Sequence, residues 1–274
     1  MNISHMCRLF LGQLQLIHIA SFGLIGSRGS IGNFISKHPD SIPIYRNNQN
    51  HLKILSKDEM IIAAVPFRSI QDVLKTIPSE RQKDLVFLCN GMVNLDQVST
   101  CAALYFGVKE DGSLITSDNP PFTSVFGLHA ENFARVLGDL GVKTEVIKDL
   151  PDFDRLRFAK LVWSSAFWLL CHCHCHCHVG SVPIGKVDKK LQNDLIDELI
   201  DVVTKSDEFN LGPNNRTQFP QKEMKRDVLD YASLMQHVTP SFELAMEEIE
   251  SRNGWFTARC KTDVHSRLLQ SIKN

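Results

Sequence analysis

The chain has 274 residues, of which 43% are hydrophobic and 22% are charged, a composition that suits a globular protein with one large or two modest cores. Its formal net charge of −1 gives no electrostatic basis for nucleic acid or an anionic membrane as a main partner. The longest apolar run, residues 161–171, is too short to cross a bilayer and is expected to form a buried helix.

The eight cysteines argue against a secreted disulfide framework, because four of them lie in one tract at residues 171–177 and the others are scattered. We therefore expect a reducing compartment, the cytoplasm. Residues 1–39 contain no Asp or Glu, and residues 1–21 are predicted to precede the first core strand. Two interpretations of residues 1–21 stay open: an organelle-targeting segment, or an extra strand or frayed extension.

Strand and helix signals alternate in the first half of the chain. Short apolar or β-branched runs predict strands, and helical periodicity appears between them. Such alternation is typical of a mostly parallel sheet with right-handed crossovers, so residues 22–150 are predicted to form a Rossmann-type α/β domain. The expected strands are residues 22–25, 42–45, 60–65, 84–89, 104–108 and 144–147, and the clearer helices are 69–76 and 128–140.

Strand signals disappear after about residue 150, and residues 151–274 are predicted to form an all-helical C-terminal domain. The pair Asn253-Gly254 is expected to end the helix before it. The expected helices are residues 153–170, 187–205, 221–237, 241–252 and 262–272.

A glycine-containing turn follows the first predicted strand. Residues 27–32 (SRGSIG) match G-x-G-x-x-G with Ser27 in place of the first glycine. Gly29 would let the backbone approach a pyrophosphate, Gly32 would allow close packing of helix on strand, and the N–H groups at Ser30 and Ile31 would bind phosphate. The order strand, turn and helix favours dinucleotide binding over the alternative of a plain glycine-rich turn.

Arg46 closes the second predicted strand. An arginine there favours the 2′-phosphate of NADP, whereas an acidic residue would favour NAD; a solvated surface arginine is the alternative. Gly32 and Arg46 are only 14 positions apart with two prolines between them, so the first helix is predicted to have about two turns.

Asn90 follows the strand at 84–89, where a side chain beyond a strand's carboxyl end can reach a nicotinamide or a substrate. The alternative is an ordinary turn formed by Asn90-Gly91.

Lys160, Ser164 and Trp168 are spaced to share one face of an apolar helix. A lysine in such surroundings either extends its ammonium to water or polarises a carbonyl group. Glu248 lies among several acidic residues, and on that evidence alone it belongs to a solvated helix face.

Cys and His alternate through residues 171–178. A helical tract spreads its ligands over about 10 Å, too far for one tetrahedral ion, and an extended tract puts all cysteines on one side and all histidines on the other. We therefore predict no metal site built from the tract alone. A metal-binding protein organised around the tract is the weakest functional hypothesis.

Taken together, these features resemble the ketopantoate reductase family over roughly residues 22–256. The resemblance rests on residues 27–32, Arg46, the Asn-Gly pair in residues 84–93, residues 160–167 and residues 243–256. It implies a Rossmann domain followed by an all-helical domain, with NADPH reducing a 2-keto acid.

The resemblance also implies roles for individual residues. Lys160 falls on the catalytic lysine and Glu248 on the active-site glutamate, Ser233 resembles a substrate-contacting serine, and Asn90 resembles an asparagine on the cofactor side. The family usually carries asparagines four and eight residues after the lysine. This chain has Ser164, which can still donate to a substrate carboxylate, and a tryptophan, which fills space.

The leading hypothesis is therefore an NADP-preferring oxidoreductase that transfers hydride to a small 2-keto carboxylate, with NAD the less favoured cofactor. The alternative is a non-catalytic dinucleotide-binding or interaction protein with a decayed site. We expect a small-molecule substrate and neither a nucleic acid nor a membrane partner, and a homodimer remains open.

Overall fold

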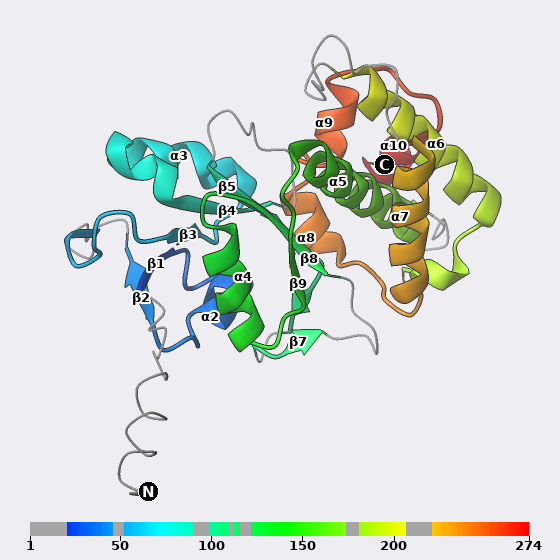
Figure 1. Ribbon diagram of the computed structural model, residues 1–274. Coiled ribbons are helices and arrows are strands. Elements are labelled where there is room, and N and C mark those ends of the chain that lie inside the picture. Colours follow the sequence, from blue (N-terminus) through cyan, green and yellow to red (C-terminus); the bar gives the residue numbers. More distant parts are fainter. Residues whose placement is uncertain are drawn as a thin grey trace, which may run out of the picture.

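The computed structural model describes residues 21–45, 52–89, 99–109, 112–115, 122–173, 181–206 and 221–273. The first half of the chain forms a seven-stranded sheet in the order β2-β1-β3-β4-β5-β8-β9, and only the pairing of β5 with β8 is antiparallel (Figure 1). The strands are β1 (Phe22–Ile25), β2 (Ser41–Ile44), β3 (Ile61–Ala63), β4 (Leu85–Cys89), β5 (Thr100–Ala103), β8 (Thr123–Gly127) and β9 (Thr144–Val146).

Helices cover both faces of the sheet. Because side chains alternate along a strand, neighbouring residues enter different cores: Ile62 packs with the helices α2 and α4, whereas Ile61 packs with α3 and α5. Both cores are apolar, which is why the strands are hydrophobic without a strict polar alternation. These helices are α2 (Ser30–Ile35), α3 (Ile70–Thr76), α4 (Ala130–Asp139) and α5 (Leu150–Cys173).

The second half of the chain is a helical region built around α5. This helix has 24 residues and is buried on nearly all sides between residues 157 and 171, because α6, α7 and α10 pack around it (Figure 1). Its predicted burial is confirmed. The surrounding helices are α6 (Lys189–Lys205), α7 (Gln221–Leu234), α8 (Phe242–Glu247), α9 (Asn253–Thr257) and α10 (Val264–Lys273).

One hydrophobic core continues from the sheet into the helical region. Phe87 and Ala103 of the sheet belong to the same cluster of buried side chains as Phe158 of α5 and Val228 of α7. The predicted fold class, a mostly parallel α/β sheet followed by helices, is confirmed. The division at residue 150 into two domains stays a prediction.

The predicted strand at residues 104–108 is wrong. β5 ends at Ala103, and the backbone N–H of Tyr105 donates to the Thr123 hydroxyl at 3.2 Å instead of continuing the ladder. The two residues of β6 (Gly107–Val108) pair with β7 (Leu114–Ile115) in a separate small hairpin.

The expected helix end at Asn253-Gly254 is also wrong. α8 ends at Glu247, a turn follows, and Asn253 begins α9. The short first helix is confirmed, because α2 has six residues. The predictions for residues 1–20, Arg46, Asn90 and most of the Cys-His tract lie outside the described residues. Within the described part of the chain, no helix is long and apolar enough to cross a membrane.

Candidate functional site

A cleft of about 450 Å³ lies beyond the carboxyl ends of β1, β3, β4 and β5. Its size is within the range of pockets that bind small molecules and cofactors, and its place at the strand ends is where α/β sheets bind their ligands. Residues of the sheet region line one part of it, and three residues after or at the end of α8 line another. The lining includes Gly29–Gly32, Ala64–Phe67, Arg68, Leu88, Phe106, Glu247, Glu248 and Arg252.

The glycine-containing turn after β1 forms part of this cleft. Gly26 has a φ of +86°, and a Cβ added there would lie 2.1 Å from the Ala64 carbonyl oxygen. A Cβ on Gly32 would lie 2.1 Å from the Gly26 carbonyl oxygen, so α2 packs directly on the turn. Gly26, rather than the Ser27 position considered above, is therefore the residue that makes the tight turn.

Gly29 is free of such crowding. A Cβ there would meet only the Gly26 carbonyl oxygen, at 3.6 Å, and Gly29 lines the cleft. The fold thus does not require glycine at this position, whereas a ligand approaching the backbone would. This open backbone in the cleft fits the pyrophosphate of a dinucleotide.

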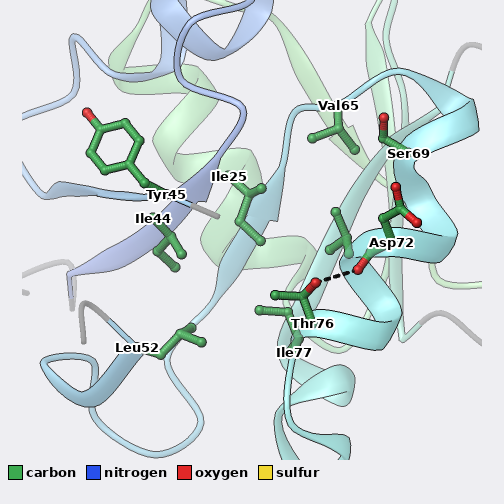
Figure 2. Close-up of a pocket in the computed structure, with 10 residues that line it drawn as sticks. Ile25, Ile44, Tyr45, Leu52, Val65, Ser69, Asp72, Thr76 and Ile77 are labelled. Carbon is green, nitrogen blue, oxygen red and sulfur yellow. Dashed lines mark hydrogen bonds between the residues drawn. The ribbon is translucent and has the colours of Figure 1, made fainter. Parts of the chain in front are cut away.

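A smaller pocket of about 110 Å³ adjoins the cleft at Val65, which lines both. It is mainly apolar and lies between the ends of β1 and β2 and the helix α3, where Figure 2 shows Ile25, Ile44 and Val65. Thr76 donates its hydroxyl to the Asp72 carbonyl oxygen at 2.7 Å. A mostly apolar pocket of this volume beside the glycine turn can hold an aromatic ring.

Tyr45, directly after β2, borders this smaller pocket, and the Arg28 guanidinium lies 5.6 Å from the centre of its ring. The residue after Tyr45 is Arg46, which is outside the described residues. The predicted contact of Arg46 with a 2′-phosphate remains a prediction.

Lys160 lies on α5 among three aromatic rings, with only 9% of its surface exposed. Its Nζ is 4.5–5.0 Å from the ring centres of Tyr105, Trp163 and Tyr231, and it donates to the Tyr231 hydroxyl at 3.2 Å. Cation–π attraction partly replaces the lost hydration of the ammonium.

Burial, and to a smaller extent the nearby positive charge of Arg252, lower the pKa of Lys160 to about 7, while the charge of Glu248 opposes this shift. An amine with such a pKa exchanges protons at neutral pH, as a general acid must. Lys160 is not among the residues that line the cleft, but its charge interacts with two residues that are.

Glu248 and Arg252 form an ion pair in the cleft, one helical turn apart and after the end of α8. Both side chains are mostly covered, with 25% and 17% of their surfaces exposed. Their burial distinguishes Glu248 from the solvated acid that its neighbours in the sequence suggested. In the structure, Glu248 and the glycine turn line the same cleft, and the positive charge of Lys160 acts on Glu248.

Ser164 and Trp168 are both buried on α5. The Ser164 hydroxyl donates to the Leu161 carbonyl oxygen at 3.1 Å within its own helix, and the Trp168 indole nitrogen has no hydrogen-bond partner among the described residues. Ser233 is exposed on α7 and does not line the cleft. Substrate contacts by Ser164 and Ser233 therefore stay predictions.

Sequence reasoning missed four residues that shape this site: Gly26, Tyr105, Tyr231 and Arg252. Gly26 was detectable, because G-x-x-G-x-x-G spans residues 26–32. Nothing in the sequence indicates that the rings of Tyr105 and Tyr231 meet Lys160, since they come from positions 55 before it and 71 after it.

The structure therefore defines a class of protein: a Rossmann-type sheet joined to a helical region, with a ligand cleft at the strand ends. No family model and no curated protein matches the chain. Solved structures do match over most of the chain, and they show which proteins share this fold.

A D-mandelate dehydrogenase, solved with NADH and anilino(oxo)acetate, is 14% identical with a TM-score of 0.61, covering 92% of this chain and 97% of its own. A ketopantoate reductase from Ralstonia eutropha is 14% identical with a TM-score of 0.59, covering 91% and 98%. A dimeric ketopantoate reductase from Staphylococcus aureus is 14% identical with a TM-score of 0.60, covering 93% and 99%. The chain has the fold of ketopantoate reductases and D-mandelate dehydrogenases.

Proposed function

We propose that this protein is an NADP-preferring oxidoreductase that reduces a small 2-keto carboxylate to the 2-hydroxy acid. The observation that supports it most is a single cleft lined by the glycine turn and by the ion pair of Glu248 and Arg252, with the charge of Lys160 acting on both members of the pair. The likeness in fold to reductases and dehydrogenases of 2-keto and 2-hydroxy acids supports it independently.

The sheet region would hold the dinucleotide. Gly29 and Gly32 would admit the pyrophosphate to the backbone of the turn, with Ser30 and Ile31 beside them, and the apolar pocket at Val65 would take the adenine ring. Arg46 would bind the 2′-phosphate, and Asn90 would lie on the nicotinamide side. When bound, the nicotinamide supplies the hydride.

The helical region would supply the acid. The Lys160 ammonium would donate its proton to the oxygen of the developing alkoxide, a role that its pKa of about 7 suits. Glu248 would orient the lysine or the substrate. The Lys160 side chain must turn from the Tyr231 hydroxyl toward the cleft for this step, and Ser164 and Ser233 are candidate substrate contacts.

A second candidate function is a dinucleotide-binding protein without catalysis. It is favoured by the enclosure of Lys160 in three aromatic rings, outside the residues that line the cleft. Under either function we expect a small-molecule ligand, no nucleic acid partner and a place in the cytoplasm, with homodimerisation, as in the dimeric ketopantoate reductase, to be measured.

Fluorescence titration of the full chain with NADPH and NADH tests the cofactor assignment. We expect NADPH to bind more tightly, and Arg46→Asp to weaken NADPH more than NADH, because the carboxylate repels the 2′-phosphate. Equal losses for both nucleotides would contradict the assignment of Arg46, and failure of the wild type to bind either would contradict the proposed function.

A further inference from the structure

Arg252 lines the cleft and uses only part of its hydrogen-bonding capacity. Its Nη2 donates to Glu248, while its Nε is buried with no hydrogen-bond partner among the residues that the structure describes. A guanidinium has five N–H donors, so one ion pair leaves donors for a second anion. The side chain is 17% exposed and lines the cleft that the glycine turn also lines.

The neighbouring polar groups of α5 are poorly suited to hold an anion. The Ser164 hydroxyl donates its hydrogen bond to the Leu161 carbonyl oxygen, and Trp168 is only 1% exposed. Lys160 is enclosed by aromatic rings. Among the described residues of the helical region, Arg252 is therefore the cation that lines the cleft and keeps an unfilled donor.

We propose that Arg252 anchors the carboxylate of the substrate. A guanidinium matches the two oxygens of a carboxylate in a planar, charge-assisted pair, which a lysine cannot reproduce. The ligand would be a compact 2-keto monocarboxylate whose carboxylate shares Arg252 with Glu248. Its description as a substrate rests on the proposed function, whereas the carboxylate site itself does not.

Arg252 has a second effect on the same site. Its positive charge lowers the pKa of Lys160. A carboxylate bound to Arg252 would offset that charge and favour the protonated lysine, the form that donates a proton. Binding of the substrate would thus prepare the acid.

Calorimetric titration with oxamate, a stable analogue of a 2-keto acid, tests the anchor in the full chain saturated with NADP⁺. We expect Arg252→Met to weaken oxamate binding by about 10- to 100-fold, the range for loss of a charge-assisted pair. Arg252→Lys keeps the charge and a partner for Glu248, so it should fold and should recover only part of the affinity. Thermal unfolding of each variant checks the fold.

Arg226→Met is the matched control, because Arg226 carries the same charge on α7, is 65% exposed and is not among the residues that line the cleft. We expect it to change oxamate affinity by less than about twofold, since an exposed charge outside the cleft is screened by solvent. Equal losses in Arg226→Met and Arg252→Met would mean a general effect of charge and would overturn the anchor.

The outcomes separate this inference from the proposed function. Unchanged oxamate affinity in Arg252→Met, or no oxamate binding to a wild type that binds NADPH, would overturn the anchor. A wild type that binds no dinucleotide would contradict the proposed function, and the oxamate titration of the chain without nucleotide would then test the anchor by itself. Dependence on Arg252 in that titration would support it, and independence would overturn it.

Discussion

The Lys160 ammonium of α5 lies 3.2 Å from the Tyr231 hydroxyl of α7, and it is the lysine that donates this hydrogen bond. The rings of Tyr231, Tyr105 and Trp163 also meet one another, with centres 4.9 Å apart for the two tyrosines and 4.4 Å for Tyr231 and Trp163. Packing of α5 against α7 and the end of β5 therefore fixes where the lysine is held.

Removal of the Lys160 ammonium should abolish most of the turnover and leave the affinity for NADPH nearly unchanged. We expect Lys160→Met to lower kcat by about 100- to 1000-fold, as for loss of one preorganised charge at a developing oxyanion, with NADPH affinity unchanged because the lysine lies in the helical region. Steady-state kinetics measure kcat, and fluorescence titration measures the affinity for NADPH. Lys190→Met, at an exposed position on α6, is the control; full activity in Lys160→Met would refute its role.

The pH dependence of the reaction should follow the protonated lysine. Because the pKa of Lys160 is lowered to about 7, chiefly by burial, the proton donor is present below that pH and is lost above it. We expect kcat/KM for reduction to fall as the pH rises above about 7. A profile that stays flat to pH 10 would show that the lysine is not the acid.

Tyr231→Phe should shift that profile toward lower pH. The hydroxyl accepts a hydrogen bond from the charged lysine and so stabilises the protonated form, and its removal should lower the pKa of Lys160 further. Tyr105→Phe is the matched control, because the Tyr105 hydroxyl donates to the Leu156 carbonyl oxygen and not to the lysine. A purely structural role for Tyr231 would reduce stability without moving the profile.

The glycine turn can be divided into a part that the fold needs and a part that the ligand needs. Gly32→Ala should destabilise the protein, because its Cβ would collide with the Gly26 carbonyl oxygen. Gly29→Ala should leave thermal stability nearly unchanged but weaken NADPH by at least about tenfold, since a methyl group would stand in the cleft. Equal NADPH affinity in Gly29→Ala and wild type would place the dinucleotide elsewhere.

Stability should fall below neutral pH because of His265. This side chain is fully buried, with its Nε2 2.9 Å from the Asn253 Oδ1, and burial lowers its pKa to about 4 although the charge of Glu198 opposes this. The unfolded chain takes up a proton near pH 6.5 and the native protein does not, so native stability is full above that pH and is lost as the pH falls toward 4.

We expect a loss of about 2 kcal/mol in the free energy of unfolding between pH 7 and pH 5 from this one group. Urea unfolding at the two pH values measures it. His265→Gln should remove that part of the pH dependence, whereas His237→Gln, at an exposed position in the turn after α7, should retain it. An unaltered pH dependence in His265→Gln would assign the loss to other groups.

The sequence predicted the elements whose signals are local. Residues 22–25 form a strand and residues 189–205 form a helix close to the expected bounds, because an unbroken apolar run or a 3.6-residue period marks each of them. β5 was missed because Thr100–Ala103 consists of small side chains, and it becomes a strand through pairing with β4 and β8. Such pairing is a property of the whole sheet.

The candidate site also contains residues that the sequence identifies and residues that only the fold reveals. The glycine turn and Lys160 could be identified from their neighbours in the sequence. The aromatic enclosure of Lys160 depends on packing between elements distant in the chain. The ion pair of Arg252 with Glu248 is local, but three acidic residues near position 248 made this segment resemble an ordinary polar surface. Only the fold shows that this segment faces the cleft.

Hydride transfer is tested most directly by oxidation of NADPH by the wild-type chain with a panel of small 2-keto acids, followed by absorbance. We expect turnover with at least one of them, lost in Lys160→Met and retained in Lys190→Met. A wild type that binds NADPH but oxidises it with no member of the panel would contradict the oxidoreductase and leave the non-catalytic dinucleotide-binding protein as the better description.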